Sequence, residues 1–339
     1  MKKLLVVLLV LGFAAPAVAA DFNFYGSART HLGYYMVDED YLGGPALESS
    51  IRGPGDDDEG VLLSLGGQSR LGAKMVVSES LSGVTELGLR EDNDGDVYLR
   101  LAYGTWNFGG GKLIVGKNYT PATFLGYSGM MGDVGDRGGA NMLVSGLPYI
   151  GRQPEIELQI GGLSLALIEP NPSAVGAYTE LDQDFPRFEA AYTFRTPMLA
   201  VRPIAALQTY EAENPATGDS EDIMSYTAGI GVSVNLKPAY VKGTFSYHQN
   251  GGNYGHTNLQ LVNGQVAMLN AQVGADGDIE DSTAFMGTLV AGMQLSEMLG
   301  VEAGFGYADA EVDVAGGTAE QTGMLFYAQA PITLTQGLK

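Results

Sequence analysis

The sequence predicts an all-β protein, a transmembrane antiparallel β-barrel. Three observations support this prediction: an N-terminal export signal with no later segment apolar enough for a spanning helix, a recurring period-two alternation of apolar and polar residues, and connections that alternate between short and long. A chain that crosses a bilayer without helices must cross it as strands closed into a barrel, because lipid satisfies no backbone hydrogen bond.

The first element is a secretory signal peptide over residues 1–20. Lys2 and Lys3 precede an apolar run from Leu4 to Phe13, and small residues end the segment at Ala20. The apolar run is shorter than the roughly 18 residues that a spanning helix needs. We expect cleavage here, export to the outer membrane through the periplasm, and a barrel domain over residues 21–339.

Composition excludes several classes of protein. The chain has a formal charge of −21, and losing the signal removes two lysines and no acids, so nucleic acid is not an expected partner. The absence of cysteine excludes disulfides, c-type haem attachment and thiolate metal sites. A mean hydropathy of +0.04 with 49 glycines and 18 tyrosines suits strands with one face in lipid and one in water.

Alternating strands follow the signal. In residues 22–34 one face is mostly apolar, with Phe22 and Phe24, and the other includes Asn23 and Arg29. Similar apolar faces occur in 71–77, 97–103, 188–194, 224–234, 283–295, 301–307 and 324–334. In 97–103 the expected lipid face is Val97, Leu99, Leu101 and Tyr103. The opposite faces include Glu86, Arg90, Glu155, Glu157, Arg202, Lys242 and His248.

The connections assign the two sides of the barrel. Short turns are expected at 79–83, 108–111, 161–162, 195–197, 237–238 and 296–300, and long loops at 37–60, 118–149, 170–184, 211–222, 250–281 and 310–321. Short periplasmic turns and long outer loops are typical of outer-membrane barrels, although the outer connection at 92–96 is short. A soluble β-sandwich shares the alternation and remains an alternative.

About fourteen strands are visible in this pattern. Leu334 is followed by residues that indicate a further turn, and Gly337-Leu338-Lys339 looks like the start of another strand. We therefore expect a barrel of sixteen strands with about two C-terminal strands missing from the sequence.

Four phrases resemble the general porin family of Gram-negative bacteria, which are trimeric, sixteen-stranded barrels whose third outer loop folds into the pore. They are Tyr25-Gly26, the segment from Ser69 to Lys74, the segment from Gly111 to Pro121, and Ile150-Gly151-Arg152. Their order and spacing match the family over most of the mature chain, so the resemblance implies the same fold and a homotrimer.

The resemblance also implies a pore constriction. Arg70, Lys117 and Arg152 fall where the family has basic residues on the barrel wall, and residues 119–149 match the inward-folded loop, with Asp133 and Asp136 as its acids. The alternation adds Arg29, Lys74, Arg90 and Arg100 to the same wall. Lys117 and Arg152 share parity with apolar residues, so a bulge or strand end must redirect them, and Pro154 is a plausible cause.

The resemblance implies that the protein is a porin, which passes small hydrophilic solutes and ions. We expect no enzymatic activity, cofactor or metal. Opposed acids and bases across a narrow water path would orient dipolar solutes. The lipid bilayer and lipopolysaccharide are the other expected partners, and the net charge weakly favours cations. The alternative is a structural or receptor-like barrel with a closed lumen.

Other signals favour structural roles. His248 and His256 lie on either side of a Gly-Gly pair, so a metal site there is not expected, and the acidic segment 92–96 lacks the glutamate that completes a calcium loop. No nucleophile or phosphate-binding motif is present. The aromatic residues expected to form a membrane-interface girdle are Tyr103, Trp106, Phe108 and Phe194.

Overall fold

The computed structural model describes residues 21–36, 59–65, 69–89, 97–124, 126–127, 148–256 and 270–334. These residues are almost entirely β-structure, with one short helix, α3 (Gly251–Tyr254). Among them, no helix has the length and apolar character needed to cross a membrane.

The strands are β1 (Asp21–Ser27), β2 (Thr30–Met36), β3 (Glu59–Leu65), β4 (Arg70–Val76), β5 (Leu81–Leu89), β6 (Val97–Asn107), β7 (Lys112–Tyr119), β8 (Arg152–Ile160), β9 (Leu163–Ile168), β10 (Glu180–Asp182), β11 (Arg187–Tyr192), β12 (Phe194–Arg195), β13 (Leu199–Glu213), β14 (Ser220–Asn235), β15 (Ala239–Gln249), β16 (Gln272–Val273), β17 (Ile279–Glu280), β18 (Ser282–Gln294), β19 (Gly300–Val314) and β20 (Gly317–Gln329).

One antiparallel sheet of sixteen strands dominates the fold. Its order is β1-β4-β5-β6-β7-β8-β9-β11-β13-β14-β15-β18-β19-β20, and β10 and β12 pair with β13 beside β11. The separate β2–β3 hairpin prolongs the β1–β4 pair, because β2 follows β1 and β3 precedes β4 in the chain. Neighbours in the sheet are therefore successive strands, as in an up-and-down barrel.

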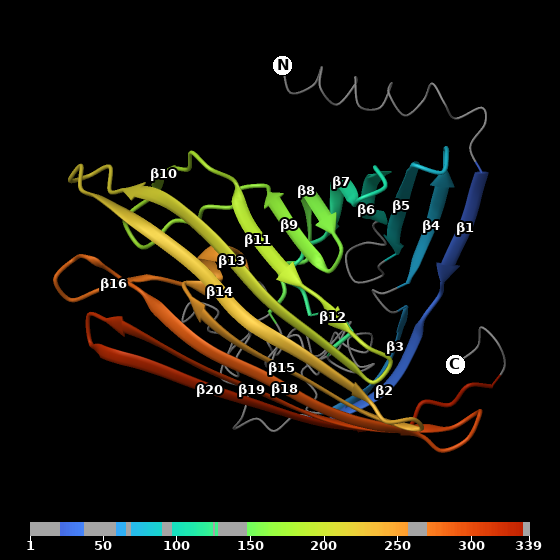
Figure 1. Cartoon of the computed structure of the whole chain (residues 1–339). Coiled ribbons are helices and arrows are strands. Elements are labelled where there is room, and N and C mark those ends of the chain that lie inside the picture. Colours follow the sequence, from blue (N-terminus) through green and yellow to red (C-terminus); the bar gives the residue numbers. More distant parts are fainter. Residues whose placement is uncertain are drawn as a thin grey trace.

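The sheet curls around a central space and has β1 and β20 at its two edges (Figure 1). Within the described ranges no pairing joins these edges, so the sheet is not closed. The prediction of a large antiparallel sheet of the transmembrane barrel type is confirmed.

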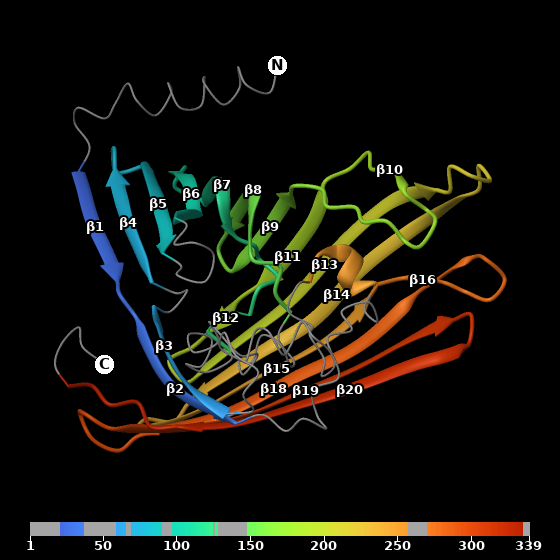
Figure 2. The same ribbon diagram turned by 180° about the vertical axis from the view of Figure 1, so that it is seen from behind.

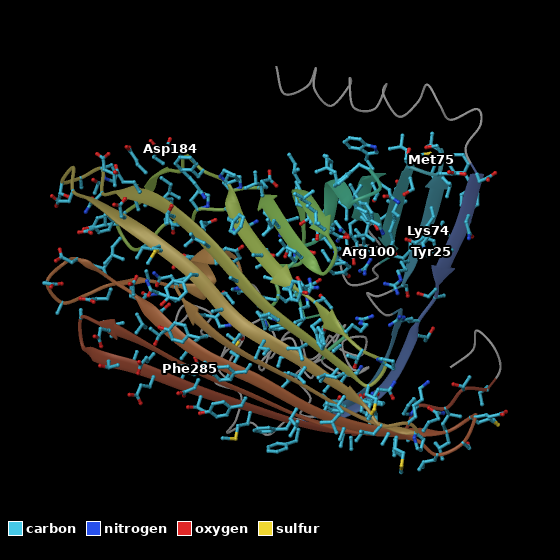
Figure 3. The ribbon with its side chains drawn as sticks, viewed as in Figure 1. Tyr25, Lys74, Met75, Arg100, Asp184 and Phe285 are labelled. Atoms are coloured by element: carbon cyan, nitrogen blue, oxygen red, sulfur yellow. The ribbon has the colours of Figure 1, made fainter. Side chains whose placement is uncertain are left out.

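The two faces of the sheet differ as the alternation predicts. On β18, Ala284, Met286 and Val290 are buried, whereas Phe285 and Leu289 are 47% and 56% exposed on the other face. Figure 3 shows Phe285 far from the group of Tyr25, Lys74 and Arg100 at the β1–β6 end of the sheet. Large exposed side chains on every main strand form an apolar outer surface that would be costly in water and suits hydrocarbon.

All six predicted short connections are turns between paired strands. The shortest joins β8 to β9 through Gly161 and Gly162, and Gly161 has a φ of +58°, a left-handed conformation that glycine adopts without strain. The same pattern joins β4 to β5, β6 to β7, β12 to β13, β14 to β15 and β18 to β19.

Two predicted long loops are wrong. Strands β13 and β14 continue through Glu213 and Ser220, and β19 and β20 continue to Val314 and Gly317, so both connections are short. The sequence interpretation took polar residues at 211–222 and 310–321 for loops. The ladder continues because polar side chains on a strand face water once the strand has left the lipid.

A bulge overturns one predicted lipid face. The pairing of β5 and β6 passes from Glu86–Leu101 to Leu87–Leu99, which leaves Arg100 as an extra residue. A one-residue shift moves every following side chain to the other face. Val97 and Leu99 are therefore exposed outside, whereas Leu101 and Tyr103 line an inner cavity, and Tyr103 does not belong to the girdle.

Tyrosine rings cover glycines of neighbouring strands along the inner face. A Cβ atom on any of these glycines would lie less than 3.0 Å from ring atoms of its tyrosine. The cross-strand pairs are Tyr25 with Gly72, Tyr98 with Gly88, Tyr240 with Gly292, and Tyr327 with Gly304.

Candidate functional site

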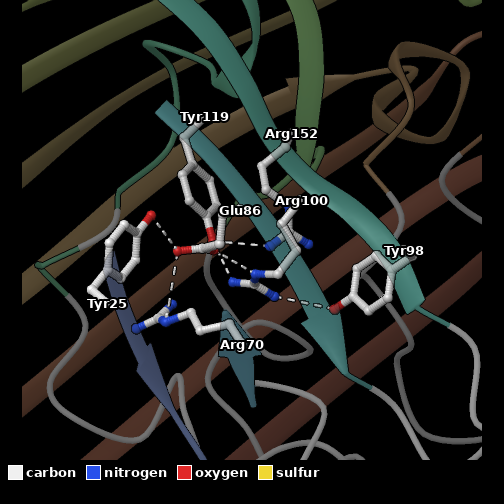
Figure 4. A network of polar contacts seen from close by, with 7 residues as sticks. All are labelled: Tyr25, Arg70, Glu86, Tyr98, Arg100, Tyr119 and Arg152. Atoms are coloured by element: carbon white, nitrogen blue, oxygen red, sulfur yellow. Dashed lines mark hydrogen bonds and ion pairs between the residues drawn. The ribbon is translucent and has the colours of Figure 1, made fainter. Parts of the chain in front are cut away.

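A polar cluster on the inner face centres on Glu86 of β5 (Figure 4). Arg100 donates from Nε to Oε1 over 2.7 Å, and the Tyr25 hydroxyl donates to Oε2 over 3.0 Å. Arg70 of β4 places its Nε 3.8 Å from the same Oε2. The Glu86 carboxylate is therefore shared by two guanidinium groups and a phenol from three neighbouring strands.

The bulge on β6 positions Arg100. As the extra residue it lies inside, fully buried, and its Nη1 and Nη2 donate to the hydroxyls of Tyr98 over 3.1 Å and Tyr119 over 3.3 Å. A buried guanidinium is stable only when a carboxylate and further acceptors offset its desolvation, and this site supplies both.

Arg152 joins the cluster through Tyr119. Its Nη1 donates to the Tyr119 hydroxyl over 3.1 Å, and its guanidinium carbon lies 5.2 Å from the centre of that ring. Arg152 is the first residue of β8, which agrees with the expectation that a strand end redirects it. Tyr149, 6.4 Å from Tyr119 between ring centres, precedes it, and burial raises the pKa of Tyr149 to about 12.

A cavity of about 490 Å³ lies beside the cluster. Arg29, Arg70 and Lys74 line it together with Glu86, and the Lys74 ammonium lies 5.6 Å from the centre of the Tyr25 ring. Arg70, Lys74 and the nearby Arg100 outnumber Glu86, the one carboxylate among the described residues that line the cavity, so this part of the surface is positive. Such a surface attracts the anionic groups of solutes in a water path.

The remaining predicted site residues are not part of the described cluster. Lys117 is opposite Ala102 and Pro154, in a row with the exposed Val115, and within the described contacts no hydrogen bond or ion pair joins it to the cluster. Arg90, Asp133 and Asp136 lie outside the described residues, as does most of the loop 119–149.

The chain after β7 folds inward. Phe124 is fully buried against β14, where a Cβ on Gly231 would lie 2.9 Å from its ring and 3.0 Å from that of Tyr127. Arg202 of β13 donates to the Pro121 carbonyl over 2.8 Å. The described beginning of the third outer loop therefore lies across the inner face of the sheet.

A second inward segment was not foreseen. The connection after β15 turns into the helix α3, which packs on β14 and β18 on the inner side (Figure 2). Its Tyr254 is fully buried in one hydrophobic cluster with Phe124 and Ile150 of the third loop and Ala206 of β13. The sequence of this connection shows no periodicity, and its contacts join residues far apart in the chain.

The same turn brings two histidines together. The rings of His248 and His256 are 4.9 Å apart, and Thr227 Oγ1 lies 2.9 Å from one and 3.0 Å from the other. The Gly-Gly pair between them starts α3 and does not separate them, contrary to the sequence interpretation. Within the described part of the chain, no group of three His, Asp or Glu side chains could hold a metal ion.

No protein-family model and no curated protein match the sequence. Solved structures match nearly the whole chain. The outer membrane channel DcaP of Acinetobacter baumannii has 15% identity and a TM-score of 0.62, over 92% of this chain and 98% of DcaP. A loop-deletion mutant of OmpT of Vibrio cholerae has 16% identity and a TM-score of 0.53, over 94% and 90%.

OmpF of Salmonella typhi, solved with daunomycin, has 10% identity and a TM-score of 0.52, over 92% of this chain and 98% of OmpF. At these identities the likeness concerns the fold. The chain has the fold of bacterial outer-membrane β-barrels.

Proposed function

We propose that this chain is an outer-membrane porin, a water-filled channel for passive diffusion of small hydrophilic solutes and ions. The observation that supports the proposal best is the contrast between the two faces of the sheet: apolar residues cover the outer face, and a cavity lined by Arg29, Arg70, Lys74 and Glu86 lies on the inner face. A polar path inside an apolar wall is what a diffusion channel needs.

The mechanism needs no chemical step. The basic residues of the inner wall provide fixed positive charge, and Tyr25 and Tyr103 provide aromatic surface beside it. A solute passes when its polar groups exchange water for these side chains without being held too tightly. The channel is accordingly non-enzymatic, and the acids Asp133 and Asp136 of the loop would face the basic wall.

Planar bilayers test the proposal directly. We expect the purified protein to produce stepwise conductance and to admit small sugars into liposomes. If the folded protein produces no conductance, the proposed channel function is contradicted and the receptor-like barrel is favoured. The packed cluster of the two inward segments is the observation that favours this second candidate, since it fills part of the inner space.

The homotrimer and the contact with lipopolysaccharide belong to the same proposal. The resemblance to the porin family supports the trimer, and OmpT of Vibrio cholerae has been solved in a trimer form. Native electrophoresis with chemical cross-linking should give a species of three chains. A monomer alone at working concentration would contradict this part of the proposal.

A further inference from the structure

Glu189 of β11 lies where both inward segments meet the barrel wall. The first segment, residues 120–124, follows β7, and the second, residues 250–256, includes α3. Glu189 is fully buried, and its strand neighbours on the inner face, Ala166 and Ala206, are small. These alanines leave space for a chain segment to approach the carboxylate.

The two carboxylate oxygens have different partners. The backbone N–H of Ala122 donates to Oε2 over 2.6 Å, and the Tyr254 hydroxyl donates to Oε1 over 2.9 Å. One wall residue therefore binds two segments separated by more than a hundred positions in the sequence. The carboxylate thus supplies one hydrogen-bond acceptor to each segment.

The contacts around Glu189 reinforce this arrangement. Arg187, two residues earlier on the same strand, donates from Nη1 to the Tyr254 carbonyl over 2.8 Å, and its guanidinium carbon lies 5.4 Å from the centre of the Tyr254 ring. Ala122 and Tyr254 belong to the same hydrophobic cluster. Displacing either segment would leave one oxygen of the buried Glu189 carboxylate without its donor and would open the shared hydrophobic cluster.

We propose that Glu189 is a positioning residue that fastens both inward segments to the wall as one unit and thereby sets the size limit of the channel. The inference rests on the proposed channel function. With the two segments docked against β11, β13 and β14, we expect the water path to run on the side of the β1–β6 wall, where the cavity beside Glu86 lies. Releasing the unit widens the path.

Three variants test the proposal. Glu189→Ala removes both acceptors, so single-channel conductance should rise roughly twofold and larger sugars should enter liposomes. Glu189→Gln should behave like the unchanged protein, because its amide oxygen can accept from Ala122 and its amide nitrogen can donate to the Tyr254 phenol. Tyr254→Phe removes one of the two bonds and should give an intermediate size limit.

Glu302 of β19 provides the matched control. It is also a buried, inward carboxylate, but its described donors come from wall strands: Tyr240 of β15, and Tyr327 and Gln329 of β20 over 2.8 and 2.7 Å. Glu302→Ala should leave the size limit unchanged. An equal widening in this control, or an unchanged size limit in Glu189→Ala, overturns the proposal. If Glu189→Ala does not fold, an unchanged Tyr254→Phe overturns it.

Hydrogen–deuterium exchange separates this proposal from the channel function. In Glu189→Ala, amide exchange should rise at least tenfold in residues 120–124 and 251–256 together, as expected when about 1.4 kcal/mol of local stability is lost. Faster exchange in one segment alone overturns the coupling. If the protein without substitutions folds but does not conduct, the channel function is contradicted. The exchange measurement still decides whether Glu189 couples the two segments.

Discussion

Glu86 and Glu189 are both buried, inward carboxylates, but their surroundings differ. Glu86 pairs with the guanidinium of Arg100 and faces a cavity, whereas Glu189 accepts from a backbone amide and a phenol and lies under two packed segments. The first site is an ion pair beside a cavity, and the second holds two inward segments against the wall. The inner wall thus has one side suited to solutes and one side suited to packing.

The largest expected effect is the loss of the ion pair. Arg100→Met should lower the free energy of unfolding by about 3 kcal/mol, because the buried Glu86 would keep only the more distant Arg70 and the Tyr25 hydroxyl as partners for its charge. Denaturant unfolding in lipid, followed by the fluorescence of the single tryptophan, Trp106, measures it. Adding Glu86→Gln should recover part of the loss. No recovery would mean that packing, and not charge, dominates at this site.

The next effect concerns ion selectivity. Replacing Arg70 and Lys74 together by glutamine should raise the permeability ratio of cations over anions roughly threefold, because the cavity loses two of its positive groups. Reversal potentials across a salt gradient measure the ratio. A matched substitution of Arg195, an exposed arginine at the short turn between β12 and β13, should not change it.

A smaller effect is a dependence of protein stability on pH that arises from His256. Burial, and then the charge of Arg187, lower the pKa of His256 to about 3. In the unfolded chain this histidine takes up a proton near pH 6.5, so the unfolded state binds more protons below that pH. The contribution of His256 to stability should therefore be complete above pH 6.5 and fall by at most about 1.4 kcal/mol per unit as the pH decreases toward 3.

Unfolding midpoints between pH 7 and pH 4 measure this dependence, and His256→Gln should flatten the profile. A profile that stays as steep in the variant would assign the dependence to other groups.

The smallest effect is expected at Lys117. Its row includes the exposed Val115 and Pro154, and it has no described link to the Glu86 cluster, so Lys117→Gln should leave the permeability ratio unchanged. Reversal potentials again measure it. A shift as large as that of the Arg70 and Lys74 double variant would mean that the lysine reaches the water path.

Local patterns predicted much of the fold. The alternation around Phe285 and the glycines at 161–162 identified strand faces and turns, because both depend on neighbours in the sequence. The prediction that Leu101 and Tyr103 face lipid was wrong, because the bulge at Arg100 arises from pairing with β5 and leaves no periodic signal in the sequence. The ends of β13 and β14 were taken for a loop because their side chains are polar, as those of loops are.

The candidate site divides in the same way. Arg70, Lys74 and Arg100 could be assigned to one wall from strand parity and from resemblance to a family. The role of Glu189 could not, because its partners Ala122 and Tyr254 lie 67 and 65 positions away and come from two connections without periodicity. Such contacts depend on how distant parts of the chain meet on the inner face of the sheet.

The tyrosine rings that lie over glycines also change how the composition is understood. A neighbouring tyrosine ring occupies the space that a side chain would need at Gly72, Gly88, Gly292 and Gly304. Glycine is required at these positions to make room for the ring and not to make the backbone flexible. Substitution by alanine at these glycines would displace a tyrosine ring whose hydroxyl binds Glu86, Arg100 or Glu302. A mutational scan should find these glycines among the least replaceable positions of the barrel wall.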